Sequence, residues 1–166
     1  MTIAQERYSV RSFSAEPVSS EVIGKIIEAG RIAPTAVNSQ PQKILVATSG
    51  EAMAALNAVS PCMYGAPHCF VCCYDMDKVC KRGENGNYGE IDVTIVLTHM
   101  MLEAANLGVG TCPVGYFDPE ALKAKLGLED NIVPVLLLPF GYPAEGCVPS
   151  PRHTEYRPAE ETVEFI

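Results

Sequence analysis

The sequence predicts an α+β fold in which helices flank a central antiparallel or mixed sheet. Three short apolar runs, residues 43–48, 69–74 and 133–140, have the length of strands and are bounded by turn-forming residues. Helical patterns lie between these runs, so strands and helices alternate loosely along the chain. The chain has 166 residues and shows no internal repeat, so we expect one domain over residues 1–166.

The helices are predicted from capping residues and apolar spacing. Ser19-Ser20 offers N-caps for an amphipathic helix that ends near Pro34, because the residue before a proline disfavours helix. Residues 51–58 are rich in alanine and predict a second helix. Asp118-Pro119-Glu120 combines a cap, a first-turn proline and an acid, and predicts a helix that ends at Gly127.

A longer helix is predicted over residues 91–107, with Gly108 as its stop. It is apolar on nearly all sides, which indicates burial in a core or between subunits. We therefore expect His99 to be a satisfied core or interface histidine. Hydrophobic residues form 48% of the chain, and this surplus favours an obligate homodimer.

The remaining segments are irregular. Residues 109–117 predict a strand broken by Pro113 and Gly115, and residues 60–66 and 77–89 predict a loop and a polar surface segment. Residues 143–166 are expected to form an extended C-terminal tail that packs on the partner subunit. The tail closes with a strand-like alternation over 162–166.

Net charge and composition exclude several classes of function. The formal net charge is −8, and no basic stripe suited to nucleic acid is present. No apolar segment is long enough to cross a bilayer comfortably, so we expect no membrane partner. The seven cysteines are odd in number and follow no secretory signal, which favours reduced thiols in a cytoplasm.

Two arginines near the start form a local basic cluster in this acidic chain. Arg7, Ser9 and Arg11 alternate, so an extended segment would place all three on one side. Guanidinium forks grip phosphate oxygens in pairs, so the cluster suits a phosphorylated ligand. A solvated charge cluster without function is the alternative. Arg152, within residues 149–153, is either a further member of this cluster or an ordinary cation of the tail.

Two further segments could contact a planar ring. Asn38 and Gln40 are alternately spaced amides in the polar loop 33–41, and each can both donate and accept hydrogen bonds. Gly115, within residues 110–118, could let the backbone approach a flat ring closely. An ordinary connecting loop and a strand end that leads into a capped helix are the respective alternatives.

The cysteines suggest a different function. Cys69 and Cys72 form a C-x-x-C pattern beside His68, but the pair lies in a strand, where positions i and i+3 face opposite sides. A redox pair needs a helix N-terminus, and zinc needs convergent ligands. We therefore interpret these cysteines as small buried apolar residues and expect no metal site. The remaining alternative is a thiol or metal-binding module built on these cysteines.

Four segments, in this order, resemble the FMN-dependent nitroreductase family. RYSVRSF at 7–13 is similar to its R-x-S-x-R-x-F opening, and APTAVNSQP at 33–41 to its A-P-S-x-x-N-x-Q-P loop. Residues 91–118 resemble its central helix and G-x-G-T-x-x-x-G segment, and PSPRH at 149–153 its basic C-terminal element. The resemblance covers most of the chain and is weakest between about residues 58 and 88. Gln42 stands where the family often has tryptophan.

The resemblance implies a homodimer that binds FMN at the subunit interface. The phosphate and ribityl chain would be held by Arg7, Tyr8, Ser9, Arg11 and Arg152. The partner subunit would contribute Pro34, Thr35, Ala36 and Asn38. The isoalloxazine ring would lie along Pro113, Val114, Gly115 and Tyr116. Gln40 joins these candidates through its amide.

The family also implies the reaction, in which NADH or NADPH reduces the flavin at N5 and an electron-poor small molecule then takes the hydride. Nitroaromatics and quinones are typical acceptors, and no protein residue is expected to be an essential acid or base. The chain is short for the family, so the site is open or covered by residues 77–89. A flavin-storage protein, or a specialised flavin dehalogenase or dehydrogenase, is the alternative.

Overall fold

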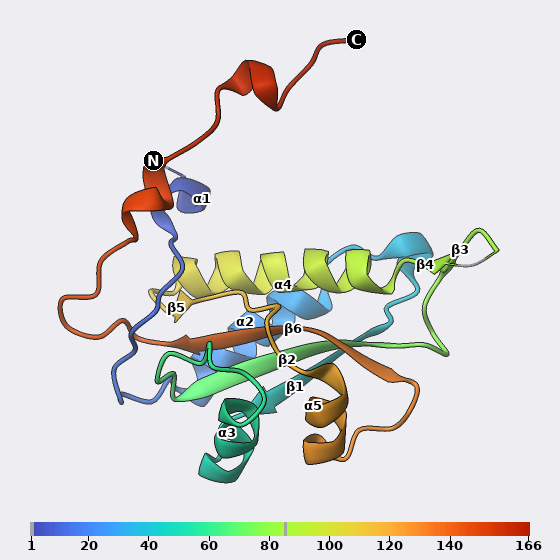
Figure 1. Cartoon of the computed structure of the whole chain (residues 1–166), viewed down its shortest axis with the longest axis horizontal. Coiled ribbons are helices and arrows are strands. Elements are labelled where there is room, and N and C mark those ends of the chain that lie inside the picture. The colour runs from blue at the N-terminus through green and yellow to red at the C-terminus, as the bar shows by residue number, and fades with distance from the viewer. Residues whose placement is uncertain (1, 85) are drawn as a thin grey trace.

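A computed structural model describes residues 2–84 and 86–166 of the chain, and its centre is a four-stranded antiparallel sheet (Figure 1). The strand order is β1-β2-β6-β5, with register pairs such as Ile44 with Cys72 and Phe70 with Leu138. The strands span Gln42–Ala47 (β1), His68–Asp75 (β2), Gly110–Thr111 (β5) and Ile132–Gly141 (β6). The predicted α+β class and the three predicted strands are confirmed, but β1 lies at the sheet edge with only Ala47 buried, so its expected burial is wrong.

Helices cover both faces of this sheet. They are α1 (Ile3–Glu6), α2 (Ser20–Arg31), α3 (Gly50–Asn57), α4 (Gly89–Asn106) and α5 (Pro119–Leu126). Figure 1 shows α2 and α4 on one face and α3 with α5 on the other. Each face buries its own cluster: Ile26, Phe70 and Met100 belong to the first, and Leu56, Leu122 and Leu137 to the second. The sheet is therefore the middle of three layers.

The predicted helix ends are confirmed by their caps. At the start of α2, the Ser19 hydroxyl accepts from the Val22 N–H at 3.3 Å. At the start of α5, the Asp118 carboxylate accepts from the Ala121 N–H at 3.0 Å. Gly127 ends α5 in the left-handed conformation, with φ of 60°. Helix α1, which the sequence did not predict, has only four residues and therefore shows no apolar period.

The interrupted strand expected within residues 109–117 is confirmed: it pairs with β6 at Gly110–Thr111 and again through a single bridge from Val114 to Leu137. Between them the Cys112 N–H donates to the Pro139 carbonyl, but Pro139 has no N–H to donate in return. The C-terminal tail is less extended than expected. The tail contains two 3-10 turns, Pro151–Thr154 and Ala159–Glu161, and no strand over 162–166. It leaves the body of the domain with its last residues fully exposed (Figure 1).

The long helix α4 is buried on one face only. Val93, Val96 and Met100 face the core, whereas His99 is exposed in the single chain. The His99 Nδ1 lies 2.9 Å from the Ile95 carbonyl oxygen of its own helix. A core position for His99 is therefore wrong, and an interface position stays a prediction.

Residues 77–89 contain a small hairpin. Strands β3 (Lys81–Arg82) and β4 (Gly86–Asn87) pair antiparallel, and the Tyr88 N–H donates to the Cys80 carbonyl at 3.0 Å. The polar surface character expected for this segment is confirmed; its Asn85 lies outside the described residues. The hairpin leads directly into the first turn of α4.

His68 is a buried polar anchor between the sheet and the N-terminal segment. Its Nε2 accepts from the Val18 N–H at 3.3 Å, and its ring packs against Phe140 with centroids 5.3 Å apart. Burial penalises the charged imidazolium and lowers the pKa of His68. Protonation would also remove the lone pair that accepts from Val18.

We predict that His68 makes the free energy of unfolding pH-dependent. The contribution of His68 to stability is complete above the pKa of a histidine in the unfolded chain, about 6.5. As the pH falls from there toward the lower pKa of the folded chain, this contribution is lost, because only the unfolded chain takes up the proton. Urea unfolding at neutral and mildly acidic pH should show a smaller loss in His68→Gln than in the parent. Equal losses in the parent and in His68→Gln would contradict the assignment.

Candidate functional site

The candidate residues fall into two groups that lie at different ends of α4. Near its C-terminal end, the Arg7 Nη1 donates to the Met101 sulfur at 3.3 Å. Near its N-terminal end, the Ala36 N–H donates to the Asp92 Oδ1 at 2.9 Å. Nine residues separate Asp92 from Met101, a rise of about 14 Å along the helix axis. No residue of the amide loop lines the groove that the basic cluster forms within one chain.

The first group forms a groove of about 750 Å³ between the N-terminal segment and the C-terminal tail. Five sequence candidates line it together: Arg7, Tyr8, Ser9, Arg11 and Arg152. The remaining lining residues were not predicted as site residues: Ala4, Ser150, His153 and Tyr156. Ligand pockets in proteins are commonly of this size.

Strand-like pairing aims the basic cluster outward. Ser9 forms a parallel bridge with Thr111, and the Val10 N–H donates to the Thr111 carbonyl at 2.9 Å. The Val10 side chain is buried, so the alternation of an extended chain turns Ser9 and Arg11 to the other side. Gly110 is required here, because a Cβ would lie 2.6 Å from a methyl carbon of Val10.

The groove is cationic and lacks internal counterions. Arg7, Arg11 and Arg152 form no ion pair with any carboxylate in residues 2–84 and 86–166. Three guanidinium groups without carboxylate partners make the groove locally positive in a chain of net charge −8 and favour an anionic ligand. The Ser150 hydroxyl accepts from the Arg152 N–H at 3.3 Å and fixes the turn that carries this arginine. The groove therefore suits a phosphate.

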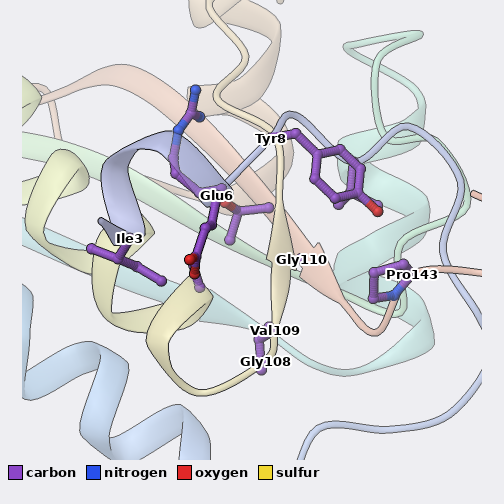
Figure 2. A pocket seen from close by; sticks show the side chains of 11 residues that line it. Ile3, Glu6, Tyr8, Gly108, Val109, Gly110 and Pro143 are labelled. Carbon is purple, nitrogen blue, oxygen red and sulfur yellow. The ribbon is translucent and has the colours of Figure 1, made fainter. Parts of the chain in front are cut away.

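A smaller pocket lies behind the groove and shares Arg7 and Tyr8 with it. Figure 2 shows it between α1, represented by Ile3 and Glu6, and the Gly108–Gly110 segment, with Pro143 at its side. Its volume of about 190 Å³ is below the usual range for organic cofactors. The larger groove is the better candidate for a cofactor.

Residues 113–116 continue from the strand that pairs with Ser9. Val114 exchanges two backbone hydrogen bonds with Leu137, at 2.8 and 2.9 Å, and its side chain is buried. Gly115 and Tyr116 are exposed, and no described residue accepts from the Gly115 N–H. The expectation that Gly115 offers its backbone to a ring therefore fits the structure, whereas Val114 has no group left to offer.

A turn that the sequence analysis described only as a loop supports this segment. The Ser60 hydroxyl donates to the Tyr116 carbonyl at 2.7 Å, and Tyr64 adopts the left-handed φ of 53°. The pKa of Tyr64 is raised by its hydrogen bond to Cys62 and by burial, while Arg11 opposes the shift. The only sequence signal for this arrangement was the turn-forming Pro61 and Gly65.

Cys112 lies between Thr111, which pairs with Ser9 of the basic cluster, and the Pro113–Tyr116 segment. Burial raises the pKa of its thiol, and the nearby Arg11 guanidinium and the Ser9 hydroxyl oppose that rise. All seven cysteines are free. Cys112 is therefore a protonated neighbour of the basic cluster.

The strand cysteines are buried apolar residues, as expected. Burial raises the pKa of both Cys69 and Cys73 to about 12, so neither is a thiolate at neutral pH. Across residues 2–84 and 86–166, no three metal-ligating side chains gather. None of the helices in this part of the chain could span a membrane.

The second group is the Thr35–Gln40 turn. Val37, Asn38 and Gln40 all have left-handed φ angles, and the Gln40 N–H donates to the Thr35 hydroxyl at 3.0 Å. Asn38 and Gln40 are exposed, and so is Pro34, while Thr35 and Ala36 are half-buried. None of these residues lines the groove of the same chain.

The two glycines of the site predict opposite outcomes on substitution. Gly110→Ala should lower the free energy of unfolding by about 1–3 kcal/mol, because its Cβ overlaps Val10. Gly115→Ala should change it by less than about 0.5 kcal/mol, since the nearest atom, in Leu136, lies 3.6 Å away. Urea unfolding of both variants checks this pair. A large loss of stability in Gly115→Ala would show that its space is needed by the fold.

Comparison with known proteins agrees with this arrangement. The family model described as "Nitroreductase family" matches residues 4–62 and 58–142. The crystal structure of a nitroreductase family protein from Clostridium difficile 630 superposes with a TM-score of 0.92 and 34% identity, covering 98% of this chain and 95% of that one.

Two further relatives are similar. A Bacillus subtilis protein named FMN reductase (NAD(P)H) is 27% identical over 163 residues, which cover 87% of this chain and 66% of the relative. A nitroreductase structure from Exiguobacterium sibiricum in complex with FMN shares the fold, with a TM-score of 0.85 at 22% identity, covering 99% of this chain and 95% of that one. The chain belongs to the nitroreductase family.

Proposed function

We propose that the protein is an FMN-dependent NAD(P)H oxidoreductase that reduces nitroaromatics, quinones or similar electron-poor acceptors. The carrying observation is the groove in which Arg7, Arg11 and Arg152 meet without carboxylate partners. The segment that holds the exposed Gly115 continues from Thr111, which pairs with Ser9 of the groove. A phosphate at one end of a ligand and a flat ring at the other fit these two features. The names of the Bacillus and Exiguobacterium relatives support FMN as that ligand.

The residues present fit an FMN phosphate. Arginine forks bind phosphate oxygens bidentately, and the Ser9 hydroxyl adds a donor on the same side of the segment. Tyr8 forms the wall of the groove: its hydroxyl donates to the Cys147 carbonyl at 3.3 Å, and its ring meets His153 edge-on with centroids 6.3 Å apart. The groove thus combines charge with an aromatic side for the ribityl chain.

A second copy of the chain completes the site in this proposal. No residue of the Thr35–Gln40 turn lines the groove of its own chain, so in this proposal the turn serves the partner's flavin. The outer side of α4 carries the exposed Ile91 and the half-buried Ile95 and Leu102 for such an interface, and Val37 of the turn is also exposed. Homodimers are the commonest assemblies, and their two equivalent sites follow from the symmetry.

The C-terminal tail belongs to the same interface. Val163, Phe165 and Ile166 are exposed in the single chain, and β1 is an open sheet edge with Val46 also exposed. Open edges attract extended segments. We propose that residues 143–166 pack on the partner subunit.

Bound FMN would supply hydride transfer at N5 between NADH or NADPH and the acceptor. The chain's own residues would bind and orient it: the arginines would hold the phosphate, the Gly115 backbone would serve the ring, and the Asn38 and Gln40 amides of the partner would serve its polar edge. The nucleotide and the acceptor use the same exposed face in turn, so turnover is ping-pong. No side chain is assigned as an acid or base.

The β3–β4 hairpin is the element available to cover the site. It precedes α4 directly, so it lies at the end that carries the Thr35–Gln40 turn rather than at its own groove. Arg82 lies over the Tyr88 ring, 5.7 Å from its centroid. A hairpin at this position can cover only the partner's flavin.

The free thiols suit a reducing cytoplasm, which we propose as the location.

The test is the visible spectrum of purified protein with FMN, before and after anaerobic NADH or NADPH. We expect a perturbed flavin band that bleaches with the nucleotide and returns when a quinone is added. A bound flavin that neither nucleotide bleaches would favour flavin storage. Absence of bound flavin would contradict the proposal.

Arg11→Ala should weaken FMN binding by about 1.5–3 kcal/mol, because one charge-assisted contact to phosphate is lost. Lys125→Ala, on α5, removes an equal charge away from the groove and should bind FMN like the parent. Equal affinities of Arg11→Ala and Lys125→Ala would remove Arg11 from the site.

A further inference from the structure

The Thr35–Gln40 turn is strained in a way that its own sequence does not demand. Val37, Asn38 and Gln40 have φ angles of 49°, 57° and 48°, in the region that glycine alone occupies without cost. For a β-branched residue such as Val37 this conformation is a genuine outlier. The surrounding structure must therefore hold the turn in place.

Asp92 fixes this turn through a hydrogen bond to its backbone. Its Oδ1 accepts from the Ala36 N–H at 2.9 Å, and its side chain comes from the first turns of α4, 56 residues away in sequence. The residue is only 1% exposed. A buried carboxylate that accepts from a backbone N–H is a strong contact, since a charged acceptor meets a preoriented donor.

The support is incomplete in the single chain. The second carboxylate oxygen of Asp92, the Ser39 hydroxyl and the Gln42 amide oxygen are buried and have no hydrogen-bond partner among the described residues. Buried polar atoms without partners cost stability, and they gather here beside three strained residues. Such violations concentrate where a site is preorganised for a ligand.

The strained turn presents a defined surface. Val37 is 85% exposed at its tip, and the amides of Asn38 and Gln40 are exposed on either side. We propose that Asp92 is a positioning residue that fixes this turn in the left-handed conformation needed to present the two amides to FMN. This inference rests on the proposed function and adds a residue that touches no cofactor.

Three variants separate positioning from general stability. Asp92→Ala loses the acceptor for Ala36, so FMN affinity should fall by about tenfold or more, the value of one hydrogen bond to a charged group. Asp92→Asn keeps an acceptor oxygen and should stay within about threefold of the parent. Glu90→Gln, two residues away and exposed, is the matched control and should bind as the parent. Fluorescence titration with FMN measures all three.

Substitutions at Val37 keep the proposal testable if Asp92→Ala fails to fold. Val37→Ala removes the exposed side chain but retains the Cβ, while Val37→Gly also releases the backbone. We expect Val37→Gly to be at least as stable as Val37→Ala, because the φ strain is relieved, and yet to bind FMN more weakly. The bound-flavin band should also lie closer to that of free FMN in Val37→Gly.

The outcomes distinguish this inference from the proposed function. If the parent binds no FMN, the proposed function fails. If the parent binds FMN and folded Asp92→Ala shows the same affinity and spectrum, Asp92 has no positioning role. Equal FMN affinities of Val37→Gly and Val37→Ala would likewise overturn the inference, since the restricted backbone would then contribute nothing.

Discussion

Helix α4 fixes the distance between the two halves of the candidate site. Its 18 residues connect Asp92, which holds the amide turn, with Met101, which contacts Arg7. A helix packed against the sheet along one face cannot shorten this distance. We propose that a second chain brings its turn to this groove, since no residue of the chain's own turn lines it.

The other constraint is the pairing of the N-terminal segment with β5. The Ser9–Thr111 bridge and the buried Val10 hold the segment extended, and the close approach depends on Gly110. The same pairing joins the basic cluster to the Gly115 segment, so in the proposed site one strand edge sets the positions of both the phosphate and the ring. In this proposal the chain's residues orient the ligand, and no side chain is assigned as an acid or base.

Much of the fold was predictable because its signals are local. Apolar runs predicted three of the strands, and the capping oxygens of Ser19 and Asp118 predicted the helix starts. Where a second segment decides the outcome, local signals fail: Pro139 of β6 cannot donate to Cys112 and interrupts the ladder after Thr111, and nothing in residues 162–166 says whether a partner strand is present. The basic cluster was predictable from charge alone.

Features of the site that depend on long-range contacts were not predictable. The Ala36–Asp92 hydrogen bond joins residues 56 positions apart, and the left-handed Tyr64 is held by its neighbours in space. Ser150 and His153 line the groove only because the tail folds back over the N-terminal segment. Such contacts leave no periodic pattern in the sequence.

The central claim is that each flavin site combines the groove of one chain with the turn of another. Subunit mixing tests it most directly: Arg11→Ala damages the groove, Asn38→Ala damages the turn, and the two variants are unfolded, mixed and refolded together. The account predicts that mixed dimers regain one intact FMN site, about one in four of all sites in a statistical mixture. Unimproved FMN binding in the mixture, with dimers formed, would place both halves of the site in the same chain and contradict the account.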